Sequence, residues 1–135
     1  MVIYSKGKKY FAPRYLTELK KILKKNNEAH LLGGGTDLSL LVTKERKEIN
    51  SIIYMNSIDE LNYIKNNKKY IEIGASTSLT EFETYIEKYY PDFATILKRY
   101  GSVQIRNVAT ISGNISTASP IGDTLPLLLS LDAKV

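Results

Sequence analysis

Three consecutive glycines, Gly33 to Gly35, follow the mostly apolar run 29–32 and constrain the fold more than any other feature of this chain. Without a Cβ, the backbone here can take positive φ and approach a ligand closely. Its amides and the Thr36 hydroxyl could surround a phosphate or diphosphate. The spacing differs from the dinucleotide fingerprint, because Leu38 occupies the sixth position, and from a P-loop, because no Gly-Lys-Ser/Thr follows. The alternative is a tight strand-to-helix turn that binds nothing.

Residues 1–55 predict a small α/β layer with partly parallel strands. An extended segment is expected at 9–13, and a helix at 15–25, where the apolar positions share one face. The run 29–32 predicts a buried strand, in which His30 is a core or edge residue rather than a ligand. A short helix is expected after the glycines, and a second buried strand at 51–55.

Residues 56–135 predict a second α+β region. Capping-box spacing at 57–60 and 78–81 predicts two helix starts, and runs 61–64 and 70–74 predict a hairpin. Helices are expected at 78–89 and 91–100, the second ending at Gly101, and a last helix at 123–131. Residues 105–115 have no clean period and predict an irregular stretch that holds a ligand close to the backbone. The last residues, 134–135, are interpreted as the start of a strand, so we expect this region to be incomplete.

Cysteine is absent and His30 is the one histidine among 135 residues. The chain therefore has no thiolate for a zinc site or an iron–sulfur cluster, and we expect no metal site. Apolar residues make up 43% and charged residues 24%, which is ordinary for a globular domain. No apolar run is long enough to span a membrane and no signal peptide is visible, so we expect a cytoplasmic protein without a membrane partner.

The charge is uneven along the chain. Residues 1–69 contain 14 Lys and Arg against seven Asp and Glu, a balance of +7, and residues 70–135 contain five against seven, a balance of −2. A basic half can attract nucleic acid, an acidic protein or a phosphate-bearing cofactor. Because the bases are scattered, a solvated surface is the favoured interpretation. Most of the ten tyrosines are expected in the core, so we predict no nucleic-acid partner.

A second candidate segment combines 110–114 with 118–123, where small hydroxyl residues, glycine and asparagine suit the edge of a flat cofactor. Asp123 could bond a ligand hydroxyl or cap the last helix. The alternative is a loop satisfied by its own backbone. Arg106 could face a phosphate or a partner carboxylate, or form a surface ion pair. No arrangement for acid–base or nucleophilic catalysis is evident, so no catalytic residue is expected and a cofactor would supply any chemistry.

The segment Leu31–Leu38 and the segment Gln104–Asp123 together resemble the FAD-binding domain of molybdenum hydroxylases. That family includes xanthine dehydrogenase, aldehyde oxidase and the flavoprotein of carbon monoxide dehydrogenase. The resemblance implies an α+β fold of two subdomains with FAD between them. Residues 1–55 would form an N-terminal α/β subdomain with the diphosphate-binding loop, and residues 56–135 a second, incomplete α+β subdomain with the flavin-proximal motif.

The resemblance also implies which residues contact FAD. The first segment would surround the diphosphate with backbone amides, and the second would approach the ribityl chain and the isoalloxazine. The cofactor contacts carried over are Leu32, Gly33, Gly34, Gly35, Thr36, Asp37, Leu38, Tyr100, Ala109, Thr110, Ile111, Ser112, Gly113, Asn114 and Asp123. Ser112 stands where the family has glycine and is expected to crowd the cofactor. We expect a Cβ at Gly34 to block the diphosphate and to leave the fold intact.

The implied function is that of an FAD-binding electron-transfer subunit of a molybdenum hydroxylase of the xanthine dehydrogenase type. Electrons would pass from iron–sulfur clusters through FAD to NAD or another acceptor. Because this chain lacks cysteine, the resemblance places the molybdenum cofactor and the 2Fe-2S clusters on partners, a molybdenum-binding large subunit and an iron–sulfur small subunit. The alternative is a non-catalytic interaction fragment of the same fold that has lost FAD.

Overall fold

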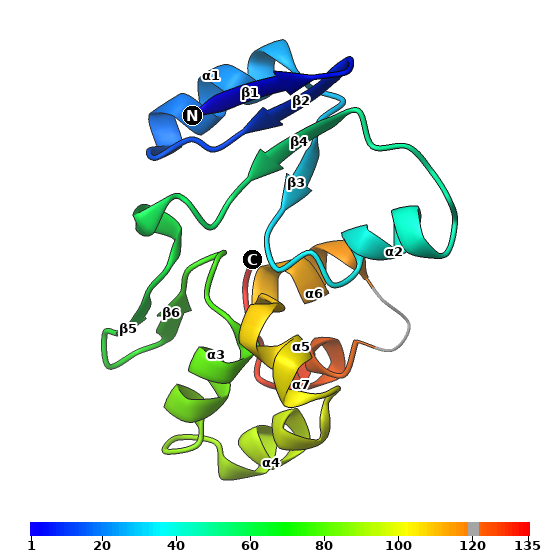
Figure 1. Cartoon of the computed structure of the whole chain (residues 1–135). Helices are drawn as coiled ribbons and strands as arrows, with labels where there is room; N and C mark the ends of the chain where they lie inside the picture. The colour runs from blue at the N-terminus through cyan, green and yellow to red at the C-terminus, as the bar shows by residue number, and fades with distance from the viewer. Residues whose placement is uncertain (119–121) are drawn as a thin grey trace.

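The computed structural model describes residues 1–118 and 122–135 and contains a four-stranded sheet near its N-terminus (Figure 1). The strands are β1 (Val2–Ser5), β2 (Lys8–Phe11), β3 (His30–Leu32) and β4 (Ser51–Tyr54), in the order β1-β2-β4-β3. β2 and β3 both pair parallel with β4, and β1 pairs antiparallel with β2. The predicted partly parallel layer is therefore confirmed, whereas β1 lies outside every predicted element.

Helix α1 (Leu16–Lys25) packs on this sheet, as its one-sided apolar pattern predicts. Its Leu19 joins Phe11 of β2, Ile53 of β4 and Ile58 in a buried cluster. Lysines occupy the exposed positions of the helix, and Lys24 and Lys25 lie in the last turn, where cations are favoured by the helix dipole. The loop after β3 leads into α2 (Leu38–Thr43), the short helix expected after the glycines.

The second region begins with a single turn of 3₁₀ helix at Asp59–Leu61 and a hairpin of β5 (Ile64–Asn66) and β6 (Ile71–Ile73). The hairpin is thus confirmed, but its first strand begins at Ile64, where the predicted run 61–64 ends, and its second strand is shorter than the predicted 70–74. In the part of this region that the structure describes, five helices follow: α3 (Leu79–Ile86), α4 (Pro91–Arg99), α5 (Val103–Val108), α6 (Ile111–Thr117) and α7 (Thr124–Ser130). No helix in 1–118 or 122–135 has the length and apolar character needed to cross a membrane.

The core of the second region is centred on the aromatic pair Phe82 and Phe93, whose ring centroids are 5.4 Å apart at nearly right angles. The predicted capping box that opens α3 is present, because Ser78 and Glu81 exchange hydrogen bonds. These bonds, first that from the Ser78 backbone amide, hold the pKa of Glu81 below its ordinary value. Gly101 has a φ of +54°, as its predicted place after α4 requires.

Residues 105–115 belong to two short helices, α5 and α6, separated by the extended residues 109 and 110, so the prediction of an irregular stretch is wrong. Two hydroxyls supply the reason: Ser102 accepts a hydrogen bond from the Ile105 amide, and Thr110 accepts one from the Gly113 amide. Each hydroxyl caps a short helix, and neither helix is long enough to show a sequence period. The predicted capping box at 57–60 is also wrong, because the Ser57 hydroxyl donates to the carbonyls of Pro13 and Tyr54 instead.

Two burial predictions are wrong as well. β3 lies at the sheet edge, and its His30 and Leu31 are exposed rather than buried. None of the ten tyrosines is buried; Tyr4, Tyr15, Tyr70, Tyr89 and Tyr90 are exposed and the other five are half-buried. A tyrosine on an apolar helix face can lie at the margin of a core with its hydroxyl in water, and a sequence pattern does not distinguish that position from the centre.

Adjacent residues of α4 give a matched test of this core. Leu97 is fully buried, whereas 38% of Ile96 is exposed. We expect Leu97→Ala to lower the free energy of unfolding by about 2–5 kcal/mol, because it leaves a cavity, and Ile96→Ala to lower it by less than about 1 kcal/mol. Urea denaturation followed by circular dichroism measures both. Equal losses in the two variants would show that α4 does not present Leu97 to the core.

Candidate functional site

The glycine loop after β3 packs directly on the junction between α5 and α6 (Figure 1). A Cβ placed at Gly34 would overlap the carbonyl oxygen of Val108 and would lie 2.7 Å from the Cα of Ala109. A Cβ at Gly33 would lie 3.2 Å from the Thr110 hydroxyl oxygen. The two segments with glycines that the sequence singles out are therefore in backbone contact.

The amides of residues 33–38 have no acceptor within the described parts of the chain. Gly33 to Thr36 are half-buried, and Gly35 has a φ of +74°, which turns the backbone at the centre of the loop. Buried and half-buried amides in proteins are nearly always paired with protein, water or ligand. Several consecutive amides left open in this way form a surface that suits an oxyanion.

The polar side chains of the second segment bond mainly to the protein. The Thr110 hydroxyl accepts a hydrogen bond from the Gly113 amide at 3.1 Å. The Ser112 hydroxyl donates to the carbonyl of Ala75. Ser112, which was expected to crowd a cofactor, is thus held by the segment before α3. Ala109 and Ile111 are buried apolar residues of the second core, and their amides donate to the carbonyls of Ile105 and Thr77.

Asn114 lies at the centre of a buried chain of hydrogen bonds. Its side-chain amide donates to the Tyr100 hydroxyl at 3.0 Å, and its side-chain oxygen accepts a bond from the Thr124 hydroxyl. Thr124 is fully buried at the start of α7. The chain therefore joins the end of α4, the middle of α6 and the start of α7, and it consumes most of the capacity of the Asn114 amide.

A side-chain bond connects the two segments: Thr117 at the end of α6 donates to the carboxylate of Asp37 at 3.0 Å. Asp37 and Asp123 also lie near Tyr100. Burial, followed by the negative charges of Asp37 and Asp123, raises the pKa of the Tyr100 hydroxyl, and the bond from Asn114 opposes this change. Asp123 makes no side-chain capping bond to α7, so its carboxylate is not used for that alternative role.

Thr117 is a member of this site that the sequence analysis did not single out. The sequence spacing could have identified Thr117, because it follows Asn114 by three residues and two residues at that spacing lie on the same face of a helix. That inference required a helix at 111–117, and the stretch was predicted to be irregular. Of the second segment, Ser119, Pro120 and Ile121 lie outside the described residues.

Arg106 is buried rather than part of a surface ion pair. Its Nε lies 3.1 Å from a carboxylate oxygen of Glu83, in an ion pair without the alignment of a hydrogen bond. Its Nη1 donates to the carbonyls of Tyr100 and Gly101 at 3.0 and 3.2 Å. Of the two functional alternatives, a phosphate or a carboxylate, the structure supplies a carboxylate from within the chain.

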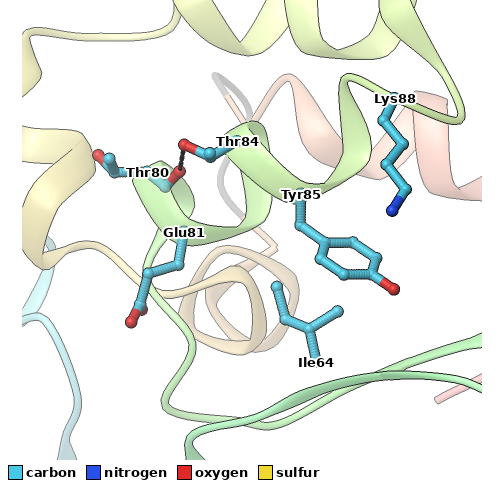
Figure 2. A pocket seen from close by; sticks show the side chains of 6 residues that line it. All are labelled: Ile64, Thr80, Glu81, Thr84, Tyr85 and Lys88. Carbon is cyan, nitrogen blue, oxygen red and sulfur yellow. Dashed lines mark hydrogen bonds between the residues drawn. The ribbon is translucent and has the colours of Figure 1, made fainter.

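Two shallow hollows lie near α3, and the second adjoins the glycine loop, because Asn56 and Val108 line it and also neighbour Gly33 and Gly34. Figure 2 shows the first, of about 440 Å³, between β5 and α3; its lining residues are Ile64, Thr80, Glu81, Thr84, Tyr85 and Lys88. The second, of about 350 Å³, is polar and is lined by Asn56, Asn62, Ser76, Ser78, Thr80, Glu81, Asn107 and Val108. Neither hollow includes a residue of 33–38 or of 109–114. Within the described ranges, no cluster of three His, Asp or Glu side chains could hold a metal ion.

The contact at Gly34 changes the expected effect of a side chain there. A Cβ meets protein backbone, so the expectation that it would leave the fold intact is wrong. We expect Gly34→Ala to lower the free energy of unfolding by about 3 kcal/mol, because backbone atoms cannot rotate away. Gly33→Ala meets a side-chain hydroxyl at 3.2 Å and should cost less. Urea denaturation compares the two, and a Gly34→Ala variant as stable as the parent protein contradicts the packing.

The raised pKa of Tyr100 predicts a pH dependence of stability. The folded state prefers the neutral hydroxyl of Tyr100. Its contribution to the free energy of unfolding is therefore complete below the pKa of an unfolded tyrosine, about 10, and is lost as pH rises through the pKa in the folded state. We therefore expect the stability of the parent protein to fall more steeply above pH 10 than that of Tyr100→Phe. Urea midpoints measured between pH 8 and pH 11, at intervals of about half a unit, test this. Parallel curves would mean that Tyr100 titrates normally.

The model of one protein family, described as the FAD binding domain in molybdopterin dehydrogenase, matches residues 5–135. The nicotinate dehydrogenase FAD-subunit of Eubacterium barkeri is 33% identical over 130 residues, which are 93% of this chain and 44% of that protein. Xanthine dehydrogenase of Emericella nidulans is 33% identical over 142 residues, which are 97% of this chain and 10% of that protein. The chain thus spans less than half the length of these curated relatives.

Solved structures have a similar fold. A Cu,Mo-CO dehydrogenase in its cyanide-inactivated form matches with a TM-score of 0.81 at 22% identity, covering 89% of this chain and 43% of that chain. Carbon monoxide dehydrogenase from Hydrogenophaga pseudoflava matches with a TM-score of 0.76 at 27% identity, covering 87% and 42%. The mixed α+β fold expected from the resemblance is thereby confirmed. Since the family model matches nearly the whole sequence, this chain belongs to the family of FAD-binding domains of molybdopterin dehydrogenases.

Proposed function

We propose that this chain binds FAD where the loop 33–37 meets α6, as the flavin-binding part of a molybdenum hydroxylase. The observation that carries the proposal is the row of amides at residues 33–38 that have no acceptor within the described protein. The contact of Gly34 with the junction of α5 and α6 fixes the position of this row. A diphosphate offers several oxygens at the spacing of successive amides, which makes it a suitable acceptor for such a row. FAD, when bound, would supply the redox chemistry that the side chains here do not.

The contacts divide between backbone and side chain. Leu32 to Leu38 would hold the diphosphate mainly through amides. The second segment would meet the rest of the cofactor with the backbone of Thr110 and Ser112, the Thr110 hydroxyl hydrogen, the Asn114 side-chain amide and the Tyr100 ring. The amides of Ala109, Ile111 and Gly113 already donate hydrogen bonds within the protein, so these residues would contact the cofactor through packing alone. The carboxylate of Asp123 is not engaged in capping and suits a ligand hydroxyl, which is a hydrogen-bond donor.

We further propose the xanthine dehydrogenase type of arrangement, with electrons passing from iron–sulfur clusters to FAD and on to NAD or another acceptor. The similarity to a xanthine dehydrogenase and to a nicotinate dehydrogenase FAD-subunit, each 33% identical, supports a shared flavoprotein part and not one particular substrate. The clusters and the molybdenum cofactor would lie on an iron–sulfur small subunit and a molybdenum-binding large subunit, in keeping with the absence of cysteine in this chain.

The division into 1–55 and 56–135 also remains our proposal. Each part has a cluster of buried apolar residues, one around Ile53 and one around Phe82. Ile58 packs with the first cluster although it follows residue 55, so the connection between the parts is itself packed on the first. Such a connection favours a fixed arrangement of the two parts over a flexible linker.

A ligand series tests FAD binding and separates it from the alternative of an interaction fragment that has lost FAD. We expect quenching of flavin fluorescence on addition of the protein to FAD, with an affinity at least about tenfold higher than for riboflavin, because riboflavin lacks the diphosphate. ADP should compete with FAD. Absence of quenching with all flavins would support the interaction fragment, and equal affinity for FAD and riboflavin would remove the diphosphate from the loop.

Two glycines with the same backbone strain provide a matched pair for the loop. Gly35 has a φ of +74°, and Gly7, in the turn between β1 and β2, has a φ of +79°. Alanine at either position costs about 1–2 kcal/mol of stability through the left-handed conformation. We expect Gly35→Ala to weaken FAD binding as well, because the amides turn away, and Gly7→Ala to leave it unchanged. Equal FAD affinities in the two variants would contradict the loop assignment.

A further inference from the structure

The guanidinium of Arg106 is among the most enclosed charges of the described chain, with 9% of the residue exposed. Its counter-ion is Glu83 on α3, which is half-buried. A charge removed from water in this way costs free energy unless it is paired, and the Nε of Arg106 is paired with Glu83 without forming a hydrogen bond. Arginine is suited to such a place because its planar group presents several donors in a fixed arrangement.

The two hydrogen bonds of Arg106 are both made to carbonyls of one turn, the turn that follows α4. Nη1 donates to the carbonyls of Tyr100 and Gly101, which follow the last residue of α4. Carbonyls at the end of a helix lack partners within the helix, and a cation there is favoured by the helix dipole. Gly101 has a left-handed φ of +54°, so the chain reverses direction at this point. Arg106 therefore holds the turn from which the Tyr100 side chain projects.

The Tyr100 side chain carries that restraint to α6. Its hydroxyl accepts the bond from Asn114 at 3.0 Å, and Asn114 in turn accepts the bond from Thr124. A continuous series of contacts thus runs from Glu83 through Arg106, Tyr100 and Asn114. The ring of Tyr100 has one fixed end at the backbone and one at the hydroxyl, which leaves it little rotational freedom.

We propose that Arg106 is a positioning residue for the flavin site, which acts by fixing the Tyr100 backbone so that the Tyr100 hydroxyl and the Asn114 amide meet. Arg106 does not touch the cofactor in this role. The proposal rests on the proposed function, because Tyr100 and Asn114 are among the residues assigned to FAD. The ion pair with Glu83 neutralises the buried charge, and the two carbonyl bonds set the geometry.

Arg106→Lys tests the carbonyl bonds. Lysine keeps the charge beside Glu83 but lacks the planar group that reaches both carbonyls. We expect the Kd for FAD, from quenching of flavin fluorescence, to rise about tenfold, as loss of one to two charge-assisted bonds would produce. Arg99→Lys is the matched control, because Arg99 lies in the last turn of α4 and is exposed; its Kd should stay within about twofold.

A double-mutant cycle distinguishes positioning from general loss of stability. If Arg106 acts through Tyr100, adding Arg106→Lys to Tyr100→Phe should raise the Kd by no more than about twofold, because the hydroxyl bond is already absent. The proposal is overturned if the Kd of the double variant rises by the product of the two single increases. It is also overturned if Arg106→Lys alone has the Kd of the parent protein.

Glu83→Gln covers the case in which Arg106→Lys does not fold. It leaves both carbonyl bonds in place and removes the counter-ion, so we expect a lower urea midpoint with a Kd within about twofold of the parent value. A tenfold rise in Kd in this variant would assign the effect to the ion pair and would overturn the proposed role of the carbonyl bonds.

A measurement without flavin separates this proposal from the proposed function. In ¹⁵N spectra of the full chain, the Asn114 side-chain amide signal, assigned with Asn114→Asp, should shift in Arg106→Lys and stay in place in Arg99→Lys. No shift in Arg106→Lys shows that Arg106 does not position Asn114, whatever the protein binds. A shift in a parent protein that fails to bind FAD supports the restraint and rejects the flavin assignment.

Discussion

At Gly34 the backbone of the loop after β3 lies against the backbone of the α5–α6 junction, with no room between them for a single carbon atom. This contact determines where the open amides of residues 33–38 lie relative to α6. Because backbone atoms on both sides are involved, no change of rotamer can relieve an added Cβ. Gly33 against Thr110 and Thr117 bonded to Asp37 extend the same junction on either side. The candidate site is therefore a property of the contact between two segments, and neither segment forms it alone.

The junction also explains why so many polar side chains near the site are already bonded within the protein. Thr110 caps α6, Ser112 bonds to the segment before α3, and Asn114 joins Tyr100 to Thr124. These bonds hold the backbone of the second segment in place before any ligand arrives. A rigid surface of this kind loses little entropy on binding, since the ordering has occurred during folding. The small hydroxyl residues of this segment thus act first on the protein and only through it on a cofactor.

Local patterns predicted the local structure well and the packing poorly. The one-sided apolar spacing of α1 and the Ser78–Glu81 box both depend on residues within one or two turns, and both predictions are confirmed. The exposure of His30 depends on β3 taking an edge position, which the sequence of β3 does not encode. α5 and α6 escaped prediction because six- and seven-residue helices carry too few apolar positions to show a period. The two glycine-bearing segments were identified from their residue types and then from the resemblance, whereas the collision that requires Gly34 is visible only in the fold.

Electrostatics add a constraint that composition alone conceals. Residues 1–69 have an excess of seven positive charges, which favours an anionic partner at long range. At the site itself the carboxylates of Asp37 and Asp123 lie close enough to Tyr100 to raise its pKa, after the larger effect of burial. Exposed lysines more than about 10 Å away are largely screened at ordinary ionic strength. An anion held here must therefore be bound by amides at contact distance, which makes the geometry of the loop, and not the net charge of the chain, the basis of the proposed affinity.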